Sequence, residues 1–264
     1  MSLSLPAPDK RQLARSPLAL VVCQVQFEEL AAATDARLAV RFSQALGGRT
    51  GPYPRLEPVS IQTINVVGGP AGMQSTAQPR QGWRLQSSDG YWTVVLMPDH
   101  VALETSRYTT WSDDFQKRIA DVLDATGRLI EPAIEQRLGL RYVNRVTEPA
   151  VKAPAEWRDY VASSFLGPVL DETLGGAVQA AQQQLDLSLD DSVSCNVRHG
   201  FFSDPARRGA PTYLIDIDVY RATGQPFDLP GIKQTLATFN ERVLQVFQVV
   251  VTPQLVEFLR TADE

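Results

Sequence analysis

Alternating apolar and polar residues run through much of the chain and predict its strands. In VVCQVQF, residues 21–27, four apolar side chains fall on one face, and one valine and two glutamines fall on the other. The same period of two recurs later in the chain, and clusters of Gly, Asp, Pro and Ser separate several of the stretches. We therefore expect further strands at residues 61–67, 83–87, 91–97, 101–106, 137–146, 182–190, 192–201 and 212–220.

A period of three to four residues predicts helices between these strands. One apolar stripe follows a capping Thr34 or Asp35 and ends at the glycine pair 47–48. The pattern TWSD, which starts at Thr110, resembles a capping box, and it begins a helix that ends at Gly127. Spacing and composition also predict helices at 154–165 and 228–247, a short helix from 252 and a loop at 68–82.

The order strand, helix, several strands, helix occurs twice, over residues 18–126 and 137–250. This order predicts an α+β fold, with one or two antiparallel sheets and helices on one side. It also favours an internal duplication of a strand-helix-multistrand-helix unit. We expect an extended N-terminal lead at 1–17 and two α+β halves, 18–126 and 127–264, packed as one globular unit.

Composition indicates where the protein works. The chain has 264 residues, and 44% of them are hydrophobic, which is enough for a substantial core. Its longest apolar runs are of strand length, far short of the roughly 20 residues that a membrane-spanning helix needs. Residues 1–17 also lack the apolar core of a signal peptide. We therefore expect a cytoplasmic protein that does not enter the membrane.

Charge is uneven along the chain, whose net charge is −5. Residues 1–146 carry 16 basic and 14 acidic residues, a net of +2, and residues 147–264 carry 9 and 16, a net of −7. This difference is compatible with docking of two halves or two subunits, but chance is the favoured interpretation. The acidic total disfavours nucleic-acid binding, although aromatic residues at 91, 92, 108 and 111 precede a basic strand.

Three arginines recur at every fourth residue of the predicted strand RLGLRYVNRV. In a regular strand Arg137, Arg141 and Arg145 share one face, and Gly139 leaves a gap between the first two. Residues four apart on a strand lie about 13 Å apart, so these arginines cannot converge on one phosphate. They can follow an extended acidic partner or pair with carboxylates on neighbouring strands, such as Glu104, and ion pairs are the favoured interpretation.

The opposite face of this strand carries Tyr142 and Asn144, which need hydrogen-bond partners if they are buried. We consider a binding site for a ligand or partner formed by residues of both faces, namely Arg137, Arg141, Arg145, Tyr142 and Asn144. If the stripe is structural instead, replacement of the central Arg141 should destabilise the fold more than replacement of either outer arginine.

A second polar face is expected on the later strands. Asp216 and Asp218 point the same way from one strand and lie about 7 Å apart. Asp186 and Asp190 are expected on the same sheet face. Such an acidic face can bind a divalent cation or a basic partner, but the solvated outer face of an antiparallel sheet has the same pattern and is the favoured interpretation.

Metal, cofactor and covalent chemistry have little support in the sequence. Cys195 and His199 have ligand-like spacing, but their separation of about 13 Å on a strand prevents both from binding one zinc ion. The glycines of GGPAG lack the spacing of a nucleotide-binding loop, and the sequence has no G-x-S-x-G motif. We therefore predict no catalytic residues, no metal site and no cofactor. We expect Cys23 and Cys195 to be buried and unbonded.

Several motifs carry a resemblance to a known family. They are SSDG at 87–90, RYTTW at 107–111, GLRYVNR within the arginine-bearing strand and, near the C-terminus, IDIDVY, FNERVLQVF and VTPQL. In these motifs the chain resembles a sporadically distributed prokaryotic family of uncharacterised proteins of about the same length. The resemblance covers most of the chain and implies no catalytic residue. The patchy distribution of the family implies an accessory or defence-associated bacterial protein.

Two functional hypotheses follow from the sequence. The first is a non-enzymatic binding or protein-interaction protein that self-associates or binds a protein partner. The alternative is an enzyme or small-ligand-binding protein with a polar cleft near the Arg137–Arg145 strand. A buried pocket lined by Arg141, Tyr142 and Asn144 would favour the alternative, and a flat apolar patch would favour the first.

Overall fold

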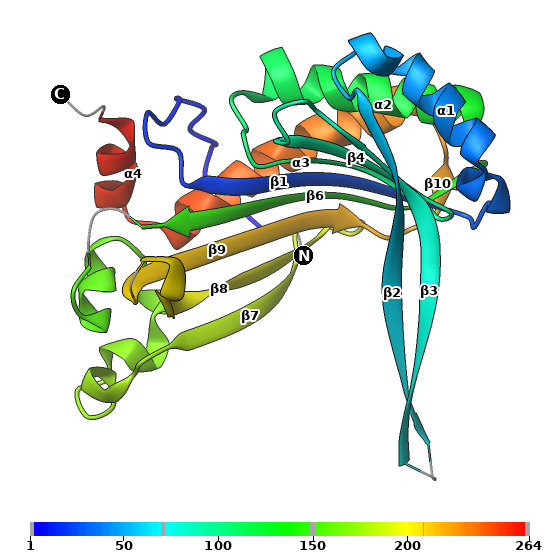
Figure 1. Cartoon of the computed structure of the whole chain (residues 1–264). Coiled ribbons are helices and arrows are strands. Elements are labelled where there is room, and N and C mark those ends of the chain that lie inside the picture. The colour runs from blue at the N-terminus through cyan, green and yellow to red at the C-terminus, as the bar shows by residue number, and fades with distance from the viewer. Residues whose placement is uncertain (1–2, 70–71, 148–150, 208, 262–264) are drawn as a thin grey trace. The chain divides into compact units, whose positions relative to one another are not determined.

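The computed structural model describes residues 3–69, 72–147, 151–207 and 209–261 (Figure 1). Among these residues ten strands form an antiparallel sheet in the order β2-β3-β4-β5-β1-β6-β9-β8-β7, and the short β10 pairs with β6. The chain divides into two compact units. Unit 1 comprises residues 1–21, 139–222 and 234–264, and unit 2 comprises residues 22–138 and 223–233.

The elements confirm the predicted α+β class and the antiparallel sheet. The strands are β1 (Leu18–Phe27), β2 (Arg55–Gly69), β3 (Gly72–Gln86), β4 (Trp92–Met97), β5 (His100–Thr105), β6 (Ile134–Val146), β7 (Ala181–Ser188), β8 (Ser194–Asp204), β9 (Ala210–Arg221) and β10 (Gln225–Pro226). The α-helices are α1 (Ala36–Ala45), α2 (Gln116–Leu129), α3 (Leu229–Val250) and α4 (Pro253–Arg260). Shorter turns of 3₁₀ or π helix are Ala31–Thr34, Gly48–Thr50, Trp111–Phe115, Pro154–Asp159, Ser163–Phe165, Gly167–Leu170, Gly175–Ala177 and Pro205–Arg207.

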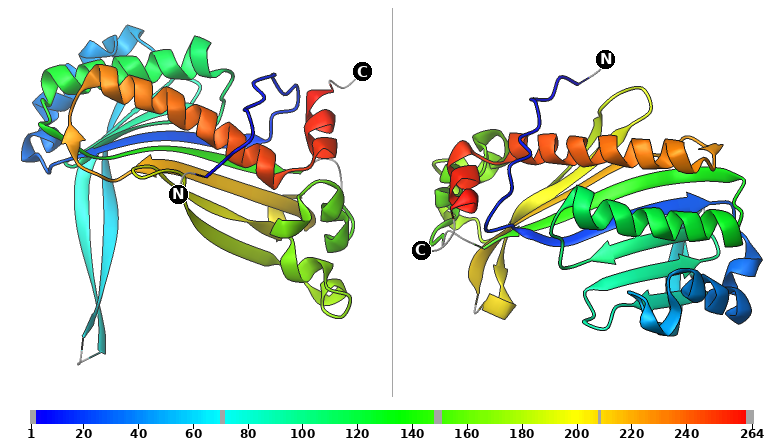
Figure 2. Two further views of the ribbon diagram at one scale, coloured as in Figure 1. Left: turned by 180° about the vertical axis from the view of Figure 1, so that it is seen from behind. Right: turned by 90° about the horizontal axis from the view of Figure 1, so that it is seen from above.

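In unit 2, α1 and α2 lie beside each other on one face of the sheet (Figure 2). Asp35 caps α1 by accepting a hydrogen bond from the backbone N–H of Arg37 at 2.6 Å. Thr110 likewise accepts one from the N–H of Asp113 at 3.3 Å in the turn before α2. The sequence predicts both caps, and the structure confirms them. The apolar stripes of the two helices are buried at Ala39, Phe42, Ile119, Val122 and Leu123.

β2 and β3 form a ribbon that extends past the other strands of unit 2 (Figure 1). Their pairing runs without a bulge for fifteen residue pairs, but β3 pairs with β4 only from Trp83 to Gln86. The remaining eleven pairs belong to β2 and β3 alone. We call this part, residues 59–69 and 72–82, the ribbon arm. At about 3.4 Å per residue it is roughly 35 Å long.

The loop predicted at residues 68–82 is therefore wrong in the described part of the chain, since β3 begins at Gly72; residues 70–71 lie outside the described residues. The stretch is rich in Gly and Gln and shows no apolar alternation. It is a strand because its backbone pairs with β2, and such pairing needs no apolar face.

In unit 1, β7, β8 and β9 form two successive antiparallel hairpins. Asp190 fixes the first turn by accepting hydrogen bonds from the N–H groups of Ser192 and Val193, both at 2.9 Å. One face of these strands is a core formed by Cys195, Val197, Phe201, Tyr213, Ile215, Ile217 and Val219.

The N-terminal lead runs extended along α3 and α4, which also belong to unit 1 from residue 234 onward (Figure 2). The carbonyl groups of Pro6 and Asp9 accept hydrogen bonds from the side chains of Gln245 and Gln248. The Asp9 carboxylate also binds Arg260. These contacts hold the lead in place without helix or strand.

The helix predicted at residues 154–165 is wrong, because only 3₁₀ turns occupy this segment. Val161, between two of these turns, forms an isolated antiparallel bridge with Val251. The N–H of Ala162 also donates to the carbonyl of Val250 at 2.9 Å. Pairing with the chain after α3 requires an extended backbone here, and this requirement overrides local helix propensity.

The internal duplication stays a prediction. Both halves of the chain show strand, helical segment, several strands and helix, but four strands lie between α1 and α2, whereas three long strands and the short β10 lie between the helical turns after β6 and α3. The compact units also divide the chain within β1 and β6, rather than between residues 126 and 137.

The predicted burial of the cysteines is confirmed. Cys23 and Cys195 are unbonded, and each is at most 1% exposed. Burial raises the pKa of both thiols, that of Cys195 to about 12, so neither is a reactive thiolate at neutral pH. Among the described residues, no helix combines the length and apolarity required to span a bilayer.

Candidate functional site

The central arginine of the predicted stripe closes an ion pair on β9. Arg141 donates from Nε and Nη2 to the two oxygens of Asp216, at 2.7 and 2.8 Å. Arg198, from β8, lies 3.2 Å from the same carboxylate. The Asp216 side chain is only 5% exposed, whereas those of Arg141 and Arg198 are 38% and 48% exposed. A buried carboxylate is therefore neutralised by two half-exposed guanidinium groups.

The outer arginines have different environments. Arg145 pairs with the buried carboxylate of Asp204 at 2.5 Å. Arg137, which lies in unit 2, donates to the Gln24 side chain at 3.4 Å. The stripe is thus a row of separate contacts, as expected from its spacing, and ion pairing of Arg141 and Arg145 follows the favoured interpretation.

Tyr142 and Asn144 lie on the opposite, buried face of β6. The Tyr142 hydroxyl donates to Asn240 Oδ1 at 2.7 Å, and the Asn144 amide donates to the carbonyl oxygen of Ile215 at 3.2 Å. Both residues are under 5% exposed. They fasten β6 to α3 and β9, and the sheet separates them from Arg141. These three side chains therefore do not line one polar cleft.

The predicted acidic face is a cross-strand ladder. Asp186 accepts a hydrogen bond from the Asn196 amide at 2.5 Å, and Asn196 lies directly opposite Asp218 in the pairing of β8 with β9. Arg198 and Asp216 form the adjacent pair. Asp190 belongs to the turn and not to this face. The neutral Asn196 separates Asp186 from Asp218, and Arg141 and Arg198 neutralise Asp216, so the ladder has the features of a structural sheet surface.

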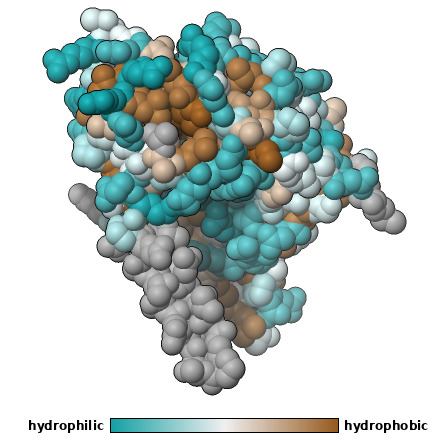
Figure 3. Space-filling model, turned by 90° about the vertical axis from the view of Figure 1, so that its right-hand side faces the viewer, coloured by the Kyte–Doolittle hydropathy of each residue, from teal (hydrophilic) through white to brown (hydrophobic). Residues whose placement is uncertain are grey.

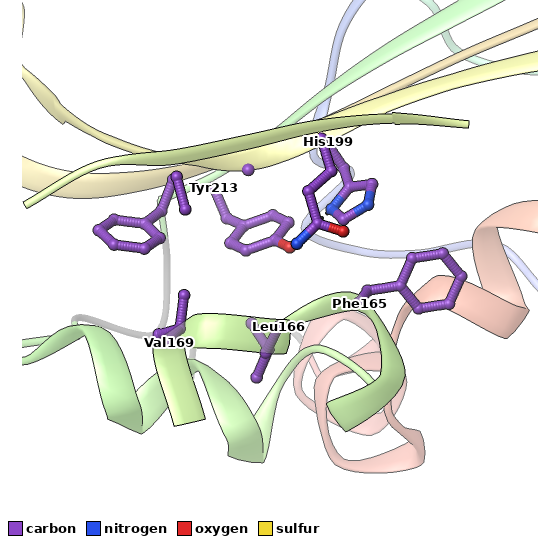
Figure 4. A pocket seen from close by; sticks show the side chains of 9 residues that line it. Phe165, Leu166, Val169, His199 and Tyr213 are labelled. Atoms are coloured by element: carbon purple, nitrogen blue, oxygen red, sulfur yellow. Dashed lines mark hydrogen bonds between the residues drawn. The ribbon is translucent and has the colours of Figure 1, made fainter. Parts of the chain in front are cut away.

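Another polar group lies in a pocket of unit 1 that the sequence did not indicate as a site. His199 on β8 is 3% exposed, and its Nδ1 lies 3.0 Å from the Tyr213 hydroxyl. Its Nε2 has no hydrogen-bond partner among the described residues. Figure 4 shows both rings between the strands and the helical turns that carry Phe165, Leu166 and Val169.

This pocket has room for about one water molecule. Burial lowers the pKa of His199 below its ordinary value, because the charged ring loses hydration. The neutral imidazole can hold such a water through Nε2. Among the described residues, no group of three or more His, Cys, Asp or Glu side chains has the geometry of a metal site.

Ion pairs hold the base of the ribbon arm, where the arm leaves the sheet of unit 2. Arg80 pairs with Asp99 in the β4–β5 turn at 2.6 Å and with Glu29 at 3.3 Å. Burial alone would raise the pKa of Asp99, but hydrogen bonds from His100 and Arg80 lower it. Asp99 is therefore charged at neutral pH and holds the β3 side of the base.

Apolar packing and a close backbone approach complete the base. Val59 of β2 packs against a buried cluster of Val95, Met97 and Ala102. At Gly82 a Cβ atom would lie 2.5 Å from the Leu96 carbonyl oxygen, so only glycine lets β3 cross the end of β4 this closely. Specific contacts at the base thus fix the direction in which the arm leaves the sheet.

Exposed apolar residues elsewhere on unit 2 are dispersed. Figure 3 shows hydrophobic residues in the upper part of the side drawn there, mixed with hydrophilic ones. Among the residues of this unit whose exposure is described, which excludes residues 62–78, the large apolar side chains that are more than two-fifths exposed are Val40, Ile61, Tyr91 and Ile134. They come from different elements, and single exposed apolar residues are ordinary. Ile61 belongs to the ribbon arm.

No protein-family model matches the chain, and a search of curated proteins finds no similar sequence. The resemblance to the sporadic prokaryotic family therefore stays an expectation.

Proposed function

We propose that the protein is a binding protein that acts by contact with another protein chain, and that the ribbon arm makes this contact. The observation that carries the proposal is the eleven-pair extension of β2 and β3 beyond their last pairing with β4. A two-stranded hairpin is at best marginally stable alone in water. An arm of this length, held to unit 2 only at its base, is therefore expected to gain stability from a partner.

The amino-acid composition of the arm supports the proposal. From Pro58 to Pro79, 22 consecutive residues contain no Asp, Glu, Lys, Arg or His. At the chain's average of 21% charged residues, such a stretch would contain about four or five. Natural proteins protect free strand edges with charges, above all lysine, to prevent pairing with other chains. The missing charges make the edge of the arm suited to such pairing.

The alternative hypothesis loses its geometric basis. A cleft lined by Arg141, Tyr142 and Asn144 would require side chains on one face, and these three lie on opposite faces of β6. The free, buried cysteines fit the reducing cytoplasm in which we place the protein. An accessory or defence-associated role is compatible with a binding protein and rests on the resemblance alone.

A photo-cross-linking experiment tests the proposal. A photoreactive amino acid replaces the exposed Ser60 at the edge of the arm, and a matched variant carries it at the exposed Glu172 in unit 1. In cells that express the full-length chain, we expect Ser60 to cross-link to a defined polypeptide that mass spectrometry identifies, and Glu172 not to do so. Equal yields at both positions, or none at Ser60, would contradict the proposal.

A further inference from the structure

β2 offers a more open edge than β3, as the prolines of the arm indicate. In an antiparallel pair, residues whose N–H and C=O groups face the partner strand alternate with residues whose groups face away. Proline has no N–H and fits only the rows that face away. Each residue of β2 and the β3 residue opposite it form one row of the ribbon. Pro58 of β2 lies opposite Trp83, and Pro79 of β3 lies opposite Gln62. Both prolines therefore lie in rows whose β2 residue has an even number.

Because the register has no bulge, rows that face away from the partner strand alternate regularly with rows that face it. The two prolines therefore fix the direction of the other backbone groups along the ribbon. The even-numbered residues of β2, from Ser60 to Gly68, direct their N–H and C=O groups away from β3. β2 is the last strand of the sheet, so no strand neighbours it on that side in the described part of the chain. The outer edge of β3 is interrupted, because Pro79 removes one of its N–H donors.

The partner that fits this edge is a second β2. Two copies related by a twofold axis would pair their β2 strands antiparallel, and each would contribute the same surface. Two identical strands repel where like charges meet, but residues 58–79 carry no charged side chain. Arg55 and Glu57 lie at the base of β2 and would face the partner's tip rather than their own counterparts.

The four-stranded order β3-β2-β2-β3 would also relieve the instability of the arm. A two-stranded hairpin is at best marginally stable alone, and pairing would join the two arms into four strands and satisfy the outward groups of both copies. We propose that the protein forms a homodimer through antiparallel pairing of the β2 edges of two ribbon arms. This inference rests on the proposed function of the arm and names its partner.

Two proline substitutions test which edge is used. Gln62→Pro removes an outward N–H from β2, and its row already contains Pro79. Ala77→Pro removes an outward N–H from β3 in the next even-numbered row, opposite Ile64. Neither change removes a hydrogen bond between β2 and β3, so the two substitutions should affect the stability of the ribbon arm itself to a similar extent.

Sedimentation equilibrium of the purified full-length protein measures the effect. We expect a mass of twice 29.1 kDa for the unmodified chain, at least a tenfold weaker dimer for Gln62→Pro, and little change for Ala77→Pro. Equal circular dichroism spectra and thermal midpoints would show that both variants fold. A monomeric unmodified chain, or equal weakening by both prolines, would overturn the inference.

The two proposals fail in different ways. A monomeric purified chain, together with a cross-link from Ser60 to a different polypeptide in cells, would refute self-pairing and support the binding function. A cross-link from Ser60 to a second copy would support both. No cross-link and no dimer would refute both.

Discussion

The β8–β9 hairpin and the ribbon arm are both long antiparallel pairs, but they are stabilised differently. β8 and β9 bury an apolar face that includes Val197 and Ile217, and their polar face carries the ion pairs of Asp216. The ribbon arm has no third strand, and no charged residue lies between Pro58 and Pro79. The first hairpin is complete within its unit, whereas the second depends on backbone pairing and leaves an edge open. A hairpin is stabilised by a buried apolar face or by pairing with a further strand. In the ribbon arm, such contacts with the rest of unit 2 are made only at its base.

Glycine substitutions should produce the largest differences between the two regions. At Gly200 in β8 the φ angle is 152°, and a Cβ atom would lie 1.9 Å from the Ala181 carbonyl oxygen. Because backbone must move, we expect Gly200→Ala to destabilise the protein by about 3 kcal/mol or more. Gly82→Ala, at the base of the arm, meets a more distant carbonyl and a flexible Met97 side chain, so we expect a smaller loss.

Denaturant midpoints measure both losses, and Gly176→Ala is the control, because a Cβ atom there meets nothing within 4 Å. A midpoint for Gly200→Ala equal to that of the control would show that β7 and β8 separate easily, and the comparison of a closely packed β8 with the open edge of β2 would then be wrong.

The ion pairs of Asp216 should give the next largest effect. Removing both guanidinium groups in an Arg141→Ala, Arg198→Ala double variant leaves a buried carboxylate without a counter-ion, which costs about 3 kcal/mol. Arg141→Ala alone leaves Arg198 in place and should cost less. Arg137→Ala, near the start of β6, removes a donor to the neutral Gln24 side chain and should cost less than the double variant.

Urea unfolding of the three variants tests this order. If Asp216→Asn restores most of the stability lost in the double variant, the stranded charge is the cause. Equal, small losses in all three variants would instead indicate a solvated stripe, and the predicted special position of Arg141 would be wrong.

His199 should make the stability of unit 1 depend on pH. Its folded pKa is lower than the unfolded value of about 6.5, so the unfolded chain binds a proton more readily. Its contribution to stability is therefore fully present above pH 6.5 and decreases as the pH falls toward the folded pKa. We expect the free energy of unfolding to fall less steeply between pH 7 and pH 5.5 in His199→Phe than in the unmodified protein.

The chain has only two histidines, so His100→Gln is the matched control for this measurement. An unchanged pH slope in His199→Phe, with the slope lost in His100→Gln, would assign the dependence to the base of the ribbon arm.

Shortening the arm should have the smallest effect on stability. Replacing residues 62–79 by an Asn-Gly turn joins Ile61 to Arg80, which are paired in the structure, and keeps the base with its Arg80–Asp99 contact. Since an isolated hairpin contributes little, the free energy of unfolding should change by less than about 1 kcal/mol at a concentration where the protein is monomeric. A large loss of cooperativity would show that the arm belongs to the fold of unit 2, and would weaken the comparison with β8 and β9.

The sequence by itself determined the helices and strands whose own residues supply the apolar repeat and the capping groups at the ends. Asp35 and Thr110 cap their helices as predicted, and alternation correctly separated Arg141 from Tyr142 on β6. The burial of both cysteines followed from the same alternation. Such features depend on local hydrogen bonds and on which side of a strand is apolar, and both are visible in a single sequence.

Only the tertiary structure decided which residues meet across the chain. It paired Arg141 with Asp216, residues that the sequence had placed in two unrelated candidate sites, and it made Val161 extended by pairing it with Val251. It also converted a polar, glycine-rich stretch into β3, because the backbone hydrogen bonds of β2 required a partner there. Backbone pairing is nearly independent of side chains, and for this reason the β3 half of the ribbon arm has no alternating pattern in the sequence that would reveal it, whereas the β2 half was predicted as a strand at residues 61–67.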